Sequence, residues 1–159
     1  MMNELDKSLL VGFTQGNKIG YYLDNYKMLP DTPGVYAILI SAETPVIFLE
    51  QGSGGFFKGK DPNVPIAELK NNWVDDTYIL YIGKATSLRK RLSQYFKFGQ
   101  GKNVGHWGGR YIWQISNAND LIVYWKPTPD NDPDKVETEL IHAFKLSHNG
   151  RRPFANLKK

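Results

Sequence analysis

The sequence contains no cysteine. Disulfides, thiolate zinc sites and cysteine nucleophiles are therefore excluded, and a bound metal must be held by oxygen or imidazole ligands. The chain also has no apolar run close to the roughly 18 residues that a membrane-spanning helix requires. Its first residues lack the positively charged segment and the apolar segment of a secretory signal. These absences predict a cytoplasmic protein with no membrane partner.

Acidic residues are missing from one long stretch of the chain. None occurs between Asp76 and Asp120. The cations of the same stretch are Lys84, Arg89, Lys90, Arg91, Lys97, Lys102 and Arg110. The net charge of +4 is too small to indicate a partner by itself. The local concentration of cations predicts a nucleic-acid-binding surface, although a solvated face without a binding role has the same composition.

The 159 residues, 41% of them hydrophobic, are enough for one well-buried core and too few for two. We predict an appended N-terminal segment, residues 1–29, that packs on a domain formed by residues 30–159. Glycines and prolines in residues 41–77 predict loops and short strands there.

Three apolar stretches predict strands, at residues 35–40, 77–82 and 121–125. Gly83 is expected to end the second strand, which places Lys84 in the turn that follows. Residues 110–115 form a short apolar run that fits either a strand or a helix.

The turn after the second strand leads into a predicted helix over residues 88–98. Ser87 is a suitable N-cap and Gly99 a suitable stop. The apolar residues that recur along this helix are Leu88, Leu92 and Phe96. Arg91 and Tyr95 are four positions apart, so they lie one above the other on a neighbouring face.

A last helix is predicted from Asp132 to about residue 146. Its apolar face contains Val136, Leu140, Ala143 and Phe144, and Glu137 falls within that face. A carboxylate on an apolar face is unstable without a cation or a strong hydrogen-bond partner. A divalent metal would be such a partner, and a salt bridge to an arginine is the alternative.

Two tripeptides frame the chemistry-bearing residues. Gly34-Val35-Tyr36 begins the first strand, and Tyr81-Ile82-Gly83 ends the second, followed by Lys84, Arg91 and Tyr95. A phenol and several cations around one strand-to-helix turn suit a phosphodiester. This arrangement resembles the GIY-YIG nuclease family, with the spacing of the nuclease domain in the incision subunit of bacterial nucleotide excision repair.

The resemblance implies an α+β fold, with a small three-stranded antiparallel sheet flanked by helices and a helix at residues 110–115. Residues 41–77 are then an insertion between the first two core strands, either a DNA-contacting loop or a cover for a sheet edge. The resemblance also implies that the protein is a metal-dependent endonuclease that hydrolyses DNA. The implied catalytic residues are Tyr36, Tyr81, Lys84, Arg91, Tyr95, Glu137 and Asn156.

Each of these residues has an implied role. Arg91 and Lys84 would bind the phosphate, and Glu137, within a Glu-x-x-Leu-Ile pattern, would hold one Mg²⁺ or Mn²⁺. Tyr36 or Tyr81 would position or deprotonate the attacking water, although both suit packing positions. Tyr95 would contact the phosphate or the other tyrosine. Asn156, in a Pro-x-x-Asn element, would help to hold the site together.

Other polar and aromatic residues carry weaker signals. No metal-binding spacing connects the histidines at positions 106, 142 and 148, which we interpret as loop or surface residues. The aromatic residues Trp107, Tyr111 and Trp113 suit either stacking on bases or packing in the core.

Two other functions fit the same sequence. The chain could be a non-catalytic nucleic-acid-binding module on the same fold, which a plasmid nicking assay would distinguish from a nuclease. It could also be a small interaction domain for an acidic protein, against which salt-dependent retention on DNA would count. The DNA structure that is cut, the biological process, and a homodimer or protein partner are left open by the sequence.

Overall fold

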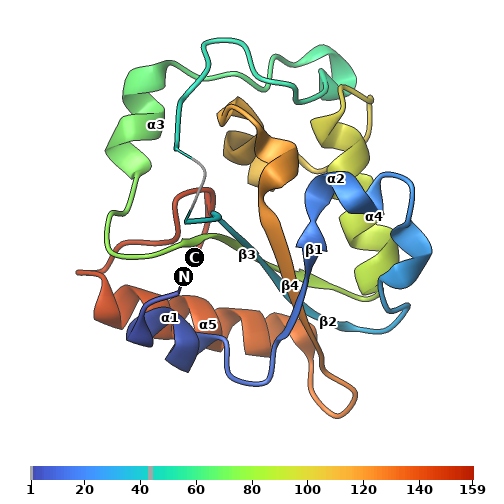
Figure 1. Ribbon diagram of the computed structural model, residues 1–159, viewed down its shortest axis with the longest axis vertical. Helices are drawn as coiled ribbons and strands as arrows, with labels where there is room; N and C mark the ends of the chain where they lie inside the picture. The colour runs from blue at the N-terminus through green and yellow to red at the C-terminus, as the bar shows by residue number, and fades with distance from the viewer. Residues whose placement is uncertain (1, 43–44) are drawn as a thin grey trace.

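A computed structural model describes residues 2–42 and 45–159. The described chain forms an antiparallel sheet of four strands in the order β1-β4-β2-β3 (Figure 1). These strands are β1 (Thr14–Lys18), β2 (Gly34–Leu39), β3 (Ile79–Ala85) and β4 (Ile122–Pro127). Within the described residues, no helix has the length and apolar character needed to cross a membrane.

The sheet has four strands where the sequence predicted three, because the N-terminal segment supplies β1. This strand pairs with β4, with Thr14 opposite Trp125. Its sequence, Thr-Gln-Gly-Asn-Lys, is polar, and four of its five residues are exposed. Backbone hydrogen bonding to the open edge of β4 therefore forms β1 without an apolar pattern that the sequence could reveal.

The rest of the N-terminal segment forms short helices. They are α1 (Glu4–Leu9), α2 (Ile19–Tyr22) and the 3₁₀ turn η1 (Tyr26–Met28). The buried carboxylate of Asp6 joins α1 to the core by accepting hydrogen bonds from the Thr77 hydroxyl at 2.6 Å and the Tyr78 N–H at 2.9 Å. Figure 1 shows α1 beside α5, and α2 beside α4.

The central strand β2 is buried along its whole length and packs on both faces. Ala37 and Leu39 contribute to the cluster that includes Ile141 and Phe144 of α5 (Pro133–Ser147). On the other face, Tyr36 belongs to the core cluster that includes side chains of α4 (Leu88–Gly99) and η3 (Trp107–Gln114). Residues 107–114 are therefore helical, as the resemblance implied, although in the 3₁₀ form.

Gly83 does not end β3, contrary to expectation. The strand continues to Ala85, and Gly83 lies opposite Tyr36 in the register. A Cβ atom at position 83 would overlap the Tyr36 ring. The glycine is thus needed for close approach of the ring, and Lys84 lies on the strand instead of in a turn.

The predicted caps of the two long helices are confirmed. The Ser87 hydroxyl accepts a hydrogen bond from the Lys90 N–H, and α4 ends at Gly99. The Asp132 carboxylate accepts one from the Asp134 N–H at the start of α5. The buried residues of α5 are Glu137, Ile141 and Phe144, whereas Ala143, which was expected on that face, is exposed.

The described residues between β2 and β3 form mainly loops, with η2 (Phe57–Gly59) and α3 (Ile66–Asn72). Residues 43 and 44 of this insertion lie outside the described chain. Of the expected short strands, the described residues form only a single bridge from Phe48 to Ile115. Phe48 also stacks on Phe154 near the C-terminus, at a centroid distance of 5.7 Å. The insertion therefore packs on the core.

Candidate active site

A cleft of about 570 Å³ lies between α4 and α5, beside strand β3. Five of the seven residues that the resemblance marked as catalytic line it. These are Tyr36, Tyr81, Lys84, Arg91 and Glu137. They come from two strands and two helices, so the fold brings together residues that are far apart in the sequence. Tyr95 and Asn156 are not among the lining residues.

Arg91 projects from α4 and is held by uncharged partners. Its Nη1 donates to the Gln94 side-chain oxygen at 2.9 Å and to the Gly105 carbonyl at 3.2 Å. In residues 2–42 and 45–159, its Nε and Nη2 atoms donate no hydrogen bond. The guanidinium is therefore fixed in place without an acidic partner, and part of its donor fork is available to an anion.

Tyr36 and Tyr81 lie on adjacent strands with ring centroids 6.0 Å apart. Tyr36 is 1% exposed and Tyr81 is 9% exposed. Burial raises the pKa of Tyr36 well above its usual value and raises that of Tyr81 to about 12, while the Arg91 charge opposes both shifts. Both phenols are therefore protonated at neutral pH, and Tyr81 loses its proton more readily.

His106 is part of this group, although the sequence placed it on a loop or surface. It is 1% exposed, and its Nε2 atom lies 3.0 Å from the Tyr36 hydroxyl oxygen in a hydrogen bond. Its ring stacks on Tyr95 at a centroid distance of 3.8 Å. Burial, and then the Arg91 charge, hold the pKa of His106 well below its usual value. The glycine-rich loop around His106 gave no sequence signal of burial.

Glu137 lies on α5 and faces the cleft. Its ion-pair partner is a lysine, whereas the sequence suggested either a metal or an arginine. The Lys159 ammonium is 2.6 Å from the Glu137 carboxylate and 2.8 Å from the Asp134 carboxylate. Lys84 forms a second ion pair with Asp134. Hydrogen bonds from Lys159, then Lys84, lower the pKa of Asp134 to about 2.

Two opposing effects act on the pKa of Lys159. Its burial alone would lower its pKa, but hydrogen bonds to Asp134 and Glu137 outweigh that effect and raise the pKa above its usual value. The ammonium is therefore charged, and it bridges two carboxylates at the edge of the cleft. The sequence gave no sign of this contact, because the two partners are separated along the chain.

Tyr95 and Asn156 support the cleft from behind. Tyr95 is fully buried, and its hydroxyl donates to the Gly109 carbonyl at 2.7 Å. It contacts Tyr81 at a ring distance of 5.6 Å, as one of its two expected roles required. Asn156 accepts a hydrogen bond from the Ile82 N–H at 3.0 Å and donates to the Ile82 carbonyl at 2.8 Å. It thereby holds the strand segment between Tyr81 and Gly83.

The cations of the acid-free stretch are divided among different surroundings. Lys84, Lys90 and Arg91 line the cleft. Arg89 donates to the Lys27 and Leu29 carbonyls, both at 2.9 Å. Arg110 stacks over Trp107, with its central carbon 4.8 Å from the ring centroid. Lys97 and Lys102 are exposed. The predicted surface is thus only partly assembled around one site.

The remaining aromatic and histidine side chains are mostly structural. Tyr111 and Trp113 are 5% and 1% exposed and pack in the core. His148, expected at the surface, is buried and stacks on Phe144 at 3.9 Å. His142 is exposed as expected. Base stacking by Tyr111 or Trp113 would therefore require the core to open.

Comparison with known proteins gives one informative similarity. The UvrABC system protein C of Nautilia profundicola is 38% identical to this chain over 71 residues. The match covers 45% of this chain and 12% of that protein. No protein-family profile matches the chain, and no solved structure is significantly similar to it. Part of this chain is therefore similar to a small part of a UvrABC system protein.

Proposed function

We propose that this chain is a metal-dependent endonuclease of the GIY-YIG family that hydrolyses phosphodiester bonds in DNA. The observation that carries the proposal is the convergence of Tyr81, Arg91 and Glu137, from three separate elements, on one cleft. Their types and spacing match the family pattern. The partial similarity to UvrABC system protein C supports the same assignment.

Arg91 is the principal phosphate ligand in this proposal. Its Nε and Nη2 donors can form charge-assisted hydrogen bonds with two oxygens of one phosphate. Lys90 adds an exposed positive charge at the same cleft. Lys84 contributes less to phosphate binding, because its ammonium is already paired with Asp134.

Tyr81 orients the attacking water. It is the more exposed of the two cleft tyrosines, and Arg91 opposes the rise in its pKa. A pKa of about 12 leaves roughly one phenol in 10⁵ ionised at pH 7. Tyr81 therefore acts mainly as a neutral hydrogen-bond acceptor that orients the water and keeps its own proton. The proton of the attacking water passes to the surrounding solvent. Tyr36 packs against Tyr81 at a ring-centroid distance of 6.0 Å and is itself held by a hydrogen bond to His106.

The carboxylates of α5 fit a divalent metal. The Lys159 ammonium between Glu137 and Asp134 marks a position at which these two groups stabilise a cation. The described residues contain no group of three or more acidic or imidazole ligands. Magnesium needs only one or two protein carboxylates, because it retains several waters. Glu137 would hold one Mg²⁺ or Mn²⁺ with Asp134 beside it, and the bound ion would stabilise negative charge at the phosphate.

Nicking of supercoiled plasmid tests this proposal directly. Wild-type protein should relax the plasmid in Mg²⁺ or Mn²⁺ and lose this activity in excess chelator. Tyr81→Phe removes the water acceptor but retains the ring, so its nicking rate should fall by about 100-fold or more. A plasmid that stays supercoiled with both metals would overturn the assignment.

One observation favours a non-catalytic nucleic-acid-binding module. Lys159 already neutralises the buried Glu137, so the carboxylate does not require a metal for stability. Such a module would bind DNA with a steep salt dependence, would not nick it, and would give no heat of Mn²⁺ binding in calorimetry. The nicking assay and the calorimetry together distinguish the two functions.

A further inference from the structure

A second groove, of about 630 Å³, lies along α4 on the face adjoining the cleft. One wall is the N-terminal segment, with Tyr22, Leu23 and Tyr26, and the other is α4. Lys90 and Gln94 of α4 line both the groove and the cleft. The two hollows are therefore separated only by the polar face of one helix.

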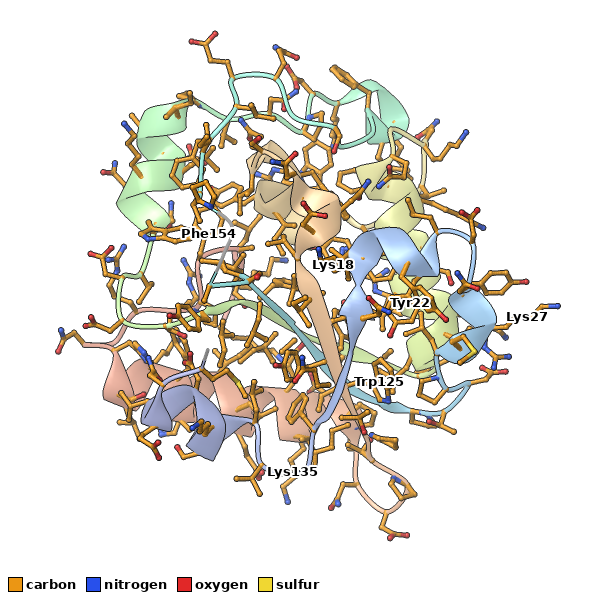
Figure 2. All side chains as sticks on the ribbon, viewed as in Figure 1. Lys18, Tyr22, Lys27, Trp125, Lys135 and Phe154 are labelled. Atoms are coloured by element: carbon orange, nitrogen blue, oxygen red, sulfur yellow. The ribbon has the colours of Figure 1, made fainter. Side chains whose placement is uncertain are left out.

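The N-terminal wall of the groove is firmly attached to α4. Tyr22 is 4% exposed and stacks on Phe96 at a centroid distance of 6.3 Å. The Arg89 guanidinium bonds to the carbonyls of Lys27 and Leu29. Figure 2 shows Tyr22 on the inner side of this segment and Lys27 projecting from η1. The groove is thus a fixed part of the fold.

The N-terminal wall exposes apolar surface to solvent. Leu23 is 38% exposed and Tyr26 is 46% exposed, and both line the groove. Nearly half of the Tyr26 surface is accessible to solvent, which makes its ring available for stacking on a flat partner. Exposed aromatic rings beside cations are the combination with which proteins bind single-stranded nucleic acid.

The charges of the groove favour an anionic partner. Arg89, Lys90 and Lys97 line it, against the single carboxylate of Asp31. Asp31 accepts a hydrogen bond from the Ser87 hydroxyl at 2.5 Å, and this bond lowers its pKa. Asp31 is therefore charged at neutral pH, and the groove keeps a surplus of two positive charges from three cations and one anion.

We propose that this groove binds a single-stranded stretch of the nucleic acid whose phosphate lies at Arg91. The strand crosses the α4 ridge at Lys90 and Gln94, one base stacks on Tyr26, and Lys97 neutralises a phosphate beyond it. The inference rests on the proposed function and deepens it, because it gives the N-terminal segment a role in substrate choice. DNA with a single-stranded tail beside the cut is the predicted preferred substrate.

Fluorescence anisotropy with two dye-labelled DNA probes tests the groove. One probe is a blunt duplex, the other carries a short single-stranded tail, and excess chelator prevents cleavage. Tyr26→Ala should weaken binding of the tailed probe by about tenfold and leave the blunt probe unaffected. Tyr26→Trp should retain the wild-type affinity. Lys97→Gln should reduce the salt slope for the tailed probe by about 0.7.

Tyr21→Ala is the matched control. Tyr21 is 40% exposed in the same segment but does not line the groove, so its loss should leave both affinities unchanged. Equal affinity of Tyr26→Ala and wild type for the tailed probe, with plasmid nicking intact, would overturn the groove alone. Binding of poly-glutamate that Tyr26→Ala abolishes, without any preference for the tail, would instead assign the groove to an acidic protein. Wild-type protein that bound neither probe would overturn this inference and the proposed function together.

Discussion

The two helices that flank the cleft differ in how their charges are satisfied. On α4, the Arg91 guanidinium is held by an amide oxygen and a backbone carbonyl, both uncharged. On α5, the carboxylates of Asp134 and Glu137 are already paired with lysines. One wall therefore presents a positioned positive charge, while the other is internally neutralised.

This difference separates two kinds of binding. A phosphate can approach Arg91 without displacing an acidic side chain, because none accepts a hydrogen bond from the guanidinium in the described residues. A metal at Glu137 must compete with the Lys159 ammonium. We therefore expect changes on α4 to act on catalysis directly, and changes around Lys159 to act mainly on metal affinity.

The largest expected effect is that of Arg91→Ala. A guanidinium that stabilises charge on a phosphate in the transition state contributes about 10³-fold or more to the rate. Nicking should fall by that amount, while the urea midpoint changes little because Arg91 is only partly buried. Lys90→Ala, at the exposed position next to Arg91 on the same helix, is the control and should weaken DNA binding only modestly. Wild-type nicking by Arg91→Ala would remove Arg91 from the site.

Glu137→Gln should lower the nicking rate by about 10²- to 10³-fold, because the carboxylate charge that holds the metal is lost. The same variant should give no heat of Mn²⁺ binding in calorimetry. Glu139→Gln is the control, since Glu139 lies on the same helix but is exposed. Identical Mn²⁺ isotherms for wild type and Glu137→Gln would show that the metal is held elsewhere.

Lys159→Gln should have a smaller effect, of opposite sign, on metal binding. Removal of the competing ammonium leaves Glu137 without its cation, while Asp134 keeps its ion pair with Lys84, so Mn²⁺ should bind about two- to fivefold more tightly. Calorimetry without DNA measures this change separately from activity. Lys158→Gln removes an exposed neighbouring charge and should leave the affinity close to that of wild type. Weaker Mn²⁺ binding by Lys159→Gln would mean that the lysine supports the metal instead of competing with it.

The smallest expected effect concerns stability and His106. Burial lowers the pKa of this imidazole in the folded state, so below about pH 6.5 the unfolded chain binds a proton that the folded chain does not. The free energy of unfolding should therefore fall as the pH drops below that value. His106→Gln should show a flatter dependence in urea titrations between pH 5 and 7, by at most about 1.4 kcal/mol per pH unit.

The elements with strong local signals were predictable from the sequence. The cap at Ser87, the cap at Asp132 and the apolar runs of the three core strands all appear in the structure. The strand β1 was not predictable, because its formation depends on backbone pairing with β4 and not on its side chains. The role of Gly83 was likewise not predictable. A Cβ atom at this position would overlap the Tyr36 ring, and this follows only from the register that places the two residues opposite each other.

At the candidate site, the sequence indicated which residues line one cleft but not which partners their side chains bind. Tyr81, Arg91 and Glu137 line one cleft, as their spacing suggested. The contacts of Glu137 with Lys159 and of Tyr36 with His106 join residues remote in sequence, and no periodicity or motif connects them. Such contacts depend on how the chain end and the loop after α4 pack, which local patterns do not specify.

The C-terminal segment has a further consequence through Asn156. Strand β3 is an edge strand of the sheet. The unpaired backbone groups of an edge strand can pair with a strand from another molecule. The Ala155 N–H and the Asn156 side chain occupy the backbone groups of β3 at Leu80 and Ile82. Removal of residues 155–159 would therefore expose these backbone groups of β3 and also remove the lysine that pairs with Glu137. Self-association and an altered metal response should then appear together.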